Sequence, residues 1–440
     1  MTTNSDQNVA VIGLGKIGLP LAVQFARQGF RVRGADINPT VVETVTNGRP
    51  PFPGEPFLEE FLGEVLESGA FTATVDTVGA VEQSSVVVVA VPLVVDVQGE
   101  PDFTAIDAAT RSIAQGLRGS ALVSFETTLP IGTTASRFVP LLESERDHSV
   151  SDSPDVVFSP ERVSSGRVFA DLRRYPKLVG GVSNSASARA VQFYDRALEF
   201  DDRDDLERPN GVWNLGSSEA AEFAKLAETT YRDVNIALAN QFARYAMDIG
   251  VDMYDIIEAC NSQPFSHLHR PGVAVGGHCI PVYPQLYLWT DQEASLVRHA
   301  REVNESMPEF VVDELESALG TLAGRHIQIL GLAYRGGVKE DAFSGAYRLR
   351  EILEQRGAIV SLSDPMYSND EIAQAGFSPT VADDVFDASI IHTDHPEYRR
   401  VLDQHSSTLG LVFDGRNVLA DFLAGDGGFP VRTLGRGVCR

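Results

Sequence analysis

The sequence predicts an α/β protein with two Rossmann-like, doubly wound parallel-sheet domains, joined by a long central helix and a helical middle domain. Short β-branched runs alternate with helical patterns in the first part of the 440-residue chain, as in a parallel sheet with crossover helices. One unusually long helical pattern follows, and the alternation then restarts. The expected domains are residues 1–210, 211–315 and 316–440, and 43% hydrophobic residues suffice for more than one core.

The expected strands of the first domain are apolar runs bounded by polar residues or glycine. They cover residues 9–12, 30–35, 86–91, 121–125 and 156–158. An acidic stretch at 199–207, followed by a Pro-Asn-Gly turn, predicts the loop that ends this domain.

The long helical pattern begins at a candidate N-cap, Ser217 or Ser218, and ends at Gly250 without an internal glycine or proline. A helix of that length spans roughly 50 Å, so we expect it to bridge two domains or two subunits. The second open α/β domain follows from four further apolar runs. They cover residues 326–334, 358–362, 388–393 and 410–413.

Charge and hydropathy disfavour several classes of function. The chain has 36 basic against 61 acidic residues, a formal net charge of −25, so we expect neither nucleic acid nor a membrane surface as partner. The longest apolar run, residues 86–95, is too short to span a bilayer, and the first residues lack the basic region of a signal peptide. Three cysteines, Cys260, Cys279 and Cys439, are too few for a disulfide framework, which predicts a cytoplasmic protein.

The first candidate site is a glycine pattern between the first strand and the first helix. It comprises Gly13, Gly15, Lys16, Ile17 and Gly18. Glycines here allow a tight turn and let a pyrophosphate approach the helix N-terminus. Asp36 follows at the end of the next strand, where a carboxylate accepts both ribose hydroxyls and repels a 2′-phosphate. The pattern predicts NAD as cofactor, and the alternative is a merely structural glycine turn.

The second candidate site is the segment Gly276-Gly277-His278-Cys279. Flanking glycines let backbone N–H groups and a substrate approach a nucleophilic thiolate. The alternative is a buried cysteine that acts as a small apolar residue. A metal site with the neighbouring histidines matches no zinc spacing, so no metal is expected.

The third candidate site is one face of the long helix, with Glu222, Lys225, Thr229 and Arg232 spaced three, four and three residues apart. The alternative is a solvated, ion-paired face. The chain has only four lysines, Lys16, Lys177, Lys225 and Lys339. This scarcity favours a functional Lys225, whose ammonium group could stabilise a developing alkoxide.

Several separate motifs resemble those of the nucleotide-sugar 6-dehydrogenase family, the UDP-glucose and UDP-N-acetylhexosamine dehydrogenases. They occur in family order over nearly the whole chain. They are the glycine pattern and residues 126–134, 159–162, 222–235, 276–281, 331–335 and 414–417.

The resemblance implies a twofold oxidation, in which the primary alcohol at C6 of a UDP-sugar becomes a carboxylate while two NAD are reduced. It implies that Cys279 forms a thiohemiacetal and then a thioester, and that Lys225 lies near the C6 oxygen. Thr128 and Glu161 correspond to the residues around the reacting water, and Thr128 is also expected at the cofactor.

The family's sugar-nucleotide contacts in the last domain map to Tyr334, Arg335 and Arg416, whose guanidinium groups suit a pyrophosphate. Many members have lysine where this chain has Arg335. Further substrate contacts are expected from Glu161, Arg162, Lys225, Arg232, Arg270, Gly276 and Gly277. The partners expected are the UDP-sugar and a second copy of the chain, joined through the long helix.

The identity of the sugar is indicated by three features. The chain looks more like the UDP-N-acetylmannosamine and UDP-N-acetylglucosamine enzymes than the UDP-glucose ones at residues 160–162, at residues 228–232 and at His278, which precedes the thiol. We therefore expect a UDP-N-acetylhexosamine, with UDP-glucose 6-dehydrogenase as the alternative.

The chain departs from the family pattern at functional positions. Tyr283 replaces an aspartate, Thr229 an asparagine and Ala342 an arginine, and residues 91–94 read Val-Pro-Leu-Val where Val-Pro-Thr-Pro is usual. With the aspartate absent, Glu161 is the base left for thioester hydrolysis. A catalytically impaired protein that only binds a nucleotide sugar is therefore one alternative function. A single-step β-hydroxyacid-type dehydrogenase, which needs no cysteine, is the other alternative.

Overall fold

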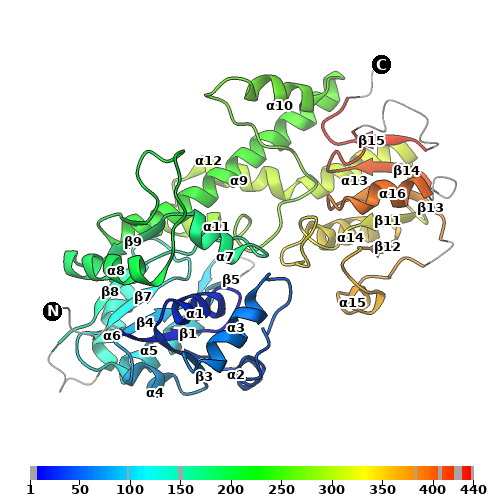
Figure 1. The fold of residues 1–440 in the computed structure, drawn as a ribbon. Coiled ribbons are helices and arrows are strands. Elements are labelled where there is room, and N and C mark those ends of the chain that lie inside the picture. Colours follow the sequence, from blue (N-terminus) through cyan, green and yellow to red (C-terminus); the bar gives the residue numbers. More distant parts are fainter. Residues whose placement is uncertain are drawn as a thin grey trace. The chain divides into compact units, whose positions relative to one another are not determined.

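The computed structural model describes residues 7–96, 99–146, 152–381, 384–404, 409–420 and 429–437, so Cys439 lies outside the described residues. The chain divides into two compact units (Figure 1). The first comprises Met1–Glu228 and Gln285–Thr290, and the second comprises Thr229–Pro284 and Asp291–Arg440.

The first unit contains an eight-stranded sheet in the order β10-β9-β8-β7-β4-β1-β2-β3. The strands are β1 (Asn8–Ile12), β2 (Arg31–Ala35), β3 (Phe71–Thr74), β4 (Val86–Val89), β7 (Leu122–Phe125), β8 (Asp155–Phe158), β9 (Lys177–Gly181) and β10 (Val212–Asn214). All neighbours pair in parallel except β8 with β9. The predicted doubly wound parallel sheet is therefore confirmed.

Helices cover both faces of this sheet. They are α1 (Gly18–Arg27), α2 (Pro39–Thr46), α3 (Leu58–Glu67), α4 (Thr77–Glu82), α5 (Thr104–Gly116), the π-helical turn η2 (Thr134–Phe138), α6 (Val139–Glu145), α7 (Val168–Arg174) and α8 (Asn184–Ala197). A short hairpin pairs β5 (Val94–Val95) with β6 (Pro101–Asp102). Successive residues of β1 alternate between two cores, since Val9 and Val11 belong to one and Ala10 and Ile12 to the other. A strand buried on both faces explains why its sequence is a continuous apolar run.

The long helix α9 (Ser218–Ile249) has the predicted bounds and contains 32 residues. Gly250 ends it in the left-handed conformation, with φ 77°. The division between the two units falls within α9, after Glu228. The helices that follow are α10 (Met253–Asn261), α11 (Tyr283–Thr290), α12 (Ser295–Glu305) and α13 (Met307–Leu319). Buried polar contacts join the second half of α9 to α12, where Asp233 pairs with Arg301 at 2.8 Å.

The second unit contains a five-stranded parallel sheet in the order β12-β11-β13-β14-β15. Its strands are β11 (His326–Leu330), β12 (Ile359–Ser363), β13 (Phe386–Ile391), β14 (Leu409–Asp414) and β15 (Val431–Thr433), and its helices are α14 (Gly345–Gln355), α15 (Asn369–Gln374) and α16 (Glu397–Gln404). The strand order reverses between β11 and β13, which makes their carboxyl ends a topological switch point. The second Rossmann-like sheet is therefore confirmed as well.

Among the helices of the described ranges, none combines the length and the apolar character needed to cross a membrane. In the same ranges, no group of three or more His, Cys, Asp or Glu side chains is arranged to hold a metal ion.

Candidate active site

The glycine pattern forms the turn between β1 and α1. Gly13 has a φ of 92°, and a Cβ added to Gly18 would lie 1.8 Å from the carbonyl oxygen of Gly13. Both positions therefore require glycine. At Gly15 an added Cβ would meet nothing within 4 Å, so the backbone there is open on the side where a ligand would approach the helix N-terminus. Lys16 and Ile17 complete this turn.

Asp36 is held beside the glycine turn by two backbone groups. Its Oδ2 accepts a hydrogen bond from the Leu14 N–H at 2.8 Å, and its Oδ1 accepts one from the Asn38 N–H at 2.9 Å. The carboxylate thus follows β2 next to an open helix N-terminus, the arrangement that binds the ribose and pyrophosphate of a dinucleotide. The residues present fit NAD.

The segment after β7, which carries Thr128, is attached to the long helix by Glu222. The Glu222 carboxylate accepts hydrogen bonds from the Gly132 N–H at 2.6 Å and from the Thr134 N–H and hydroxyl at 2.8 and 2.7 Å. Burial raises the pKa of Glu222 to about 7, although these three hydrogen bonds lower it. Thr128 itself is buried. The contact fixes this loop against α9.

Lys225 lies one helical turn after Glu222 on the same face of α9, and its side chain is only 5% exposed. One turn further, Glu228 pairs with Arg162 at 3.2 Å. On α9, Lys225 therefore lies between Glu222, which contacts the segment after Thr128, and Glu228, which contacts the residue after Glu161. Glu222, Lys225 and Thr229 of the predicted face are buried, whereas the alternative was a solvated, ion-paired face.

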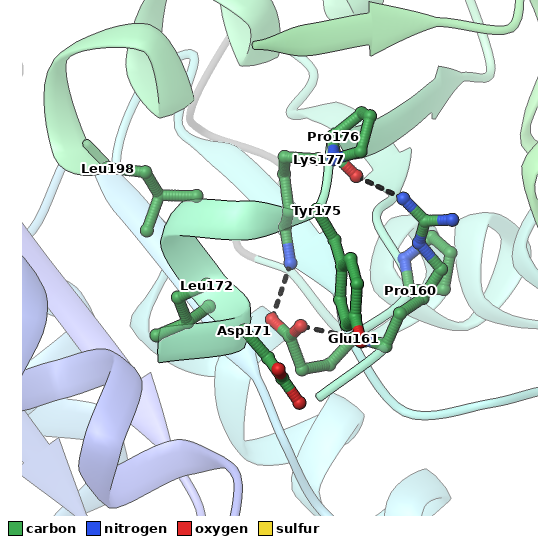
Figure 2. A pocket seen from close by; sticks show the side chains of 9 residues that line it. Pro160, Glu161, Asp171, Leu172, Tyr175, Pro176, Lys177 and Leu198 are labelled. Carbon is green, nitrogen blue, oxygen red and sulfur yellow. Dashed lines mark hydrogen bonds and ion pairs between the residues drawn. The ribbon is translucent and has the colours of Figure 1, made fainter. Parts of the chain in front are cut away.

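Glu161 lies at a pocket in the first unit and points toward a buried lysine (Figure 2). Its Oε2 is 3.0 Å from the Nζ of Lys177, and its Oε1 accepts a hydrogen bond from the Arg162 N–H at 2.7 Å. The Arg162 guanidinium also donates to the carbonyl oxygen of Pro176. These contacts fix the orientation of the Glu161 carboxylate.

Lys177 also contacts a second buried carboxylate, Glu126, whose Oε2 lies 2.5 Å from Nζ. Burial raises the pKa of Glu126 to about 7 while Lys177 lowers it. Burial lowers the pKa of Lys177, but the two carboxylates more than offset this effect and raise it above its ordinary value. The sequence alone assigned no role to Lys177 or Glu126. The available signals were the scarcity of lysine, for Lys177, and the motif of residues 126–134, for Glu126.

The thiol loop of the second unit packs closely on the segment after β11. A Cβ on Gly276 would lie 2.5 Å from the Cβ of Tyr334, and Gly277, with φ 84°, donates its N–H to the carbonyl oxygen of Ala342 at 2.8 Å. Cys279 is a free thiol of intermediate exposure, so it is not sealed in the apolar core. Its carbonyl oxygen accepts the N–H of Tyr283 at 3.0 Å.

Two predicted arginines, Arg232 and Arg335, act on Tyr334, the residue that packs on this loop. Burial raises the pKa of Tyr334, and the neighbouring charges that act on its phenol include those of Arg335, Cys279 and Arg232. The second unit therefore brings Arg232, Cys279, Tyr334 and Arg335 into one neighbourhood. Arg335 is exposed and follows β11, at the switch point of the sheet.

Arg416 is partly buried just after β14, and two nitrogens of its guanidinium group are already engaged. Its Nε donates to the carbonyl oxygen of His392 at 2.8 Å and its Nη2 to that of Tyr334 at 3.0 Å. Burial lowers the pKa of Arg416. The side chain thus fixes the backbone of Tyr334. Arg270 is exposed, and its charge acts on the buried phenol of Tyr254 together with that of Arg416.

The positions that depart from the family pattern have identifiable contacts. Tyr283 begins α11 directly after the thiol loop, and Ala342 provides the carbonyl that holds Gly277. Phe343, the next residue, has a positive φ of 51°, and its ring lies edge-on to His278 with centroids 5.9 Å apart. The strained residue therefore contacts the neighbour of Cys279.

The chain is similar to known proteins over nearly its whole length. The domain models of the UDP-glucose/GDP-mannose dehydrogenase family match the chain in order, with the NAD-binding domain at residues 7–198, the central domain at 219–306 and the UDP-binding domain at 328–421. UDP-N-acetyl-D-mannosamine dehydrogenase from Pyrococcus horikoshii is 36% identical over 98% of this chain and 99% of that protein. The enzyme of the same name from Escherichia coli K12 is 33% identical over 79% of this chain and 82% of its own length.

Two solved structures are similar over the whole chain. That of UDP-D-ManNAc dehydrogenase from Pyrococcus horikoshii has a TM-score of 0.85 at 34% identity and covers 98% of this chain and 99% of its own. That of a UDP-glucose dehydrogenase from Pyrobaculum islandicum has a TM-score of 0.84 at 27% identity and covers 99% of each chain. The chain belongs to the UDP-glucose/GDP-mannose dehydrogenase family of NAD-dependent oxidoreductases.

Proposed function

We propose that this protein oxidises the C6 alcohol of a UDP-N-acetylhexosamine to the uronic acid in two NAD-dependent steps. The observation that carries the proposal is the partly exposed thiol of Cys279, on a glycine loop that packs against Tyr334 and lies close to Arg232 and Arg335. The names of the relatives favour N-acetylmannosamine as the sugar. We assign residues 1–210 to NAD binding, 211–315 to the catalytic and dimerisation region and 316–440 to binding of the UDP half.

In the first oxidation the chain holds the cofactor and stabilises charge at C6. NAD, when bound through Gly13, Gly15, Lys16, Ile17, Gly18, Asp36 and Thr128, accepts one hydride in each oxidation. The ammonium group of Lys225 stabilises the alkoxide that develops as the C6 hydroxyl loses its proton. Loss of the hydride from C6, with the hydroxyl proton passing to solvent, leaves an aldehyde.

In the second oxidation Cys279 is the nucleophile. Its thiolate adds to the aldehyde carbon, a C–S bond forms, and the carbonyl oxygen takes a proton to give a thiohemiacetal. Loss of a second hydride from C6, together with loss of the hydroxyl proton to solvent, leaves a thioester. Water, oriented by Thr128, then attacks this carbon while Glu161 accepts the water proton, the C–S bond breaks and the thiolate is regenerated.

The second unit supplies the groups for the nucleotide. Arg335, exposed after β11, provides a guanidinium for the pyrophosphate, and Arg416 acts by holding the backbone of Tyr334. The remaining proposed contacts to the sugar nucleotide come from Arg162, Arg232, Arg270, Gly276 and Gly277.

We further propose that the protein is a homodimer through α9. In the second unit this helix leaves five large apolar side chains exposed, Tyr231, Leu238, Phe242, Tyr245 and Ile249. Their spacing of seven, four, three and four residues places them on one stripe, which we call the α9 stripe. An exposed apolar stripe of this length is characteristic of an interface, and pairing with the same helix of a second copy would bury both stripes.

The test is the yield of NADH from limiting UDP-glucose, UDP-N-acetylglucosamine, UDP-N-acetylmannosamine and UDP-N-acetylgalactosamine. We expect two NADH per molecule of an N-acetylated sugar nucleotide. One NADH per substrate would instead support a single-step dehydrogenase, and binding of a UDP-sugar without NADH would support a binding protein. Turnover of UDP-glucose alone would contradict the proposed specificity.

A further inference from the structure

Lys177, the first residue of β9, is a buried cation without a role in the reaction described above. Its side chain is 4% exposed. The ammonium nitrogen lies 2.5 Å from Glu126 Oε2, 3.0 Å from Glu161 Oε2 and 3.5 Å from the carbonyl oxygen of Ser159. Three acceptors match the three N–H donors of a lysine, so the ammonium group has a defined position.

Glu126 is held from its other side. Its Oε1 accepts a hydrogen bond from the hydroxyl of Tyr194, and that hydroxyl is 2.7 Å from the hydroxyl of Ser124. Tyr194, Ser124, Glu126 and Lys177 are all at least nine-tenths buried and form one hydrogen-bonded cluster, of which Lys177 also lines the pocket. Glu161 also lines the pocket and contacts the cluster through Lys177 (Figure 2).

We propose that Lys177 is a positioning residue for thioester hydrolysis, which holds the Glu161 carboxylate in the orientation needed to accept a proton from the reacting water. This inference rests on the proposed function. One lysine is shared by two carboxylates, so the charge on Glu126 also affects Glu161. The lysine acts through Glu161 and is not itself required for either hydride transfer.

The geometry separates this role from simple support of the fold. A buried ion pair between Lys177 and Glu126 alone would join β9 to the end of β7, and a pair of apolar residues could replace it. The contact to Glu161 is a separate interaction, made to the segment that lines the pocket. The other charged groups facing this site are Arg162, which follows Glu161, and Asp171 of α7, which pairs with Arg167 at 3.3 Å.

The decisive variant is the double substitution Lys177→Met with Glu126→Gln. Loss of the lysine alone would leave two buried carboxylates without a cation, a change expected to be strongly destabilising. The second substitution removes one of these negative charges, and the glutamine oxygen can still accept from Tyr194. Arg111→Met, which removes a cation from a surface pair with Glu145, is the matched control. Folding is verified by thermal unfolding and NAD binding.

We expect the double variant to form two NADH per active site in a rapid burst and then to turn over about tenfold to a hundredfold more slowly than wild type. The stalled protein should carry the sugar nucleotide on Cys279, visible as an increase in intact mass that hydroxylamine removes. Turnover equal to wild type, or absence of the burst, would overturn the inference. Absence of NADH from wild type with every UDP-sugar would overturn the proposed function itself.

A second variant provides a test with the lysine in place. Glu126→Gln keeps the contact between Lys177 and Glu161 and changes only the other carboxylate partner of the lysine. We therefore expect Glu126→Gln to hydrolyse the thioester faster than the double variant and to accumulate less of the adduct on Cys279. If the lysine only supported the fold, the two variants would accumulate the adduct to the same extent, so equal accumulation would refute the proposal.

Discussion

Thr134 donates two hydrogen bonds to Glu222, one from its N–H at 2.8 Å and one from its hydroxyl at 2.7 Å. Together with the Gly132 N–H, these donors surround a carboxylate that is fully buried in α9. The relationship matters for function because Lys225 is one turn away on the same helix face. The loop carrying Thr128 and the helix carrying Lys225 are thereby fixed against each other within the first unit.

Glu222 should make the free energy of unfolding depend on pH. Its pKa is raised from 4.5 to about 7 in the folded protein, so the folded state binds this proton more tightly than the unfolded state. The contribution of this group is therefore complete below about pH 4 and is lost as the pH rises through about 7, by up to about 3 kcal/mol. Glu222→Gln does not titrate, so we expect wild type to lose stability relative to this variant over that range.

Urea unfolding at several pH values measures this difference, and Glu43→Gln on the exposed face of α2 is the control. Glu43→Gln accounts for the general effect of removing one carboxylate from the surface. A Glu222→Gln difference that does not change with pH would contradict the raised pKa. At low pH the variant should be less stable than wild type by about 1–3 kcal/mol, because the glutamine NH2 cannot accept from the Gly132 N–H.

Lys225 should act on the rate of oxidation more than on substrate affinity. We expect Lys225→Met to reduce kcat by about a hundredfold to a thousandfold with a smaller change in KM, because the ammonium group acts on the developing alkoxide. Steady-state NADH kinetics measure both constants. Lys339→Met, which removes an exposed lysine paired with Glu371, should retain the wild-type rate. Equal kcat in Lys225→Met and wild type would remove Lys225 from the mechanism.

The sequence predicted the elements whose signals are local. The glycine turn, Asp36 and the bounds of α9 depend on residues close together in the chain, and the structure contains each of them. Lys177 was missed because its carboxylate partners lie 51 and 16 residues away, a distance at which no spacing pattern exists. Arg416 fits a pyrophosphate by type, but its bonds to the carbonyls of His392 and Tyr334 could not be read from the sequence.

The α9 stripe should control the oligomeric state. Tyr245→Glu or Phe242→Glu places a charge in the centre of the stripe, where burial against a second copy would be unfavourable. We expect either variant to be monomeric at concentrations where wild type is a dimer, as measured by light scattering coupled to size exclusion. Leu296→Glu, at an exposed apolar position of α12 outside the stripe, should leave the mass unchanged. A wild-type monomer would contradict the proposed dimer.

Cys279→Ser should separate the two oxidations. A serine hydroxyl is a far weaker nucleophile at neutral pH than a thiolate, so the aldehyde from the first oxidation would not be converted efficiently to an ester. We expect sustained NADH production to fall at least about a thousandfold, with binding of the UDP-sugar retained and no mass adduct on the protein. Cys260→Ser, which changes the other free cysteine of the described residues, should keep the wild-type rate and stoichiometry. Two NADH per sugar at wild-type rate in Cys279→Ser would exclude a covalent thioester, because no second thiol would remain at this position to form it.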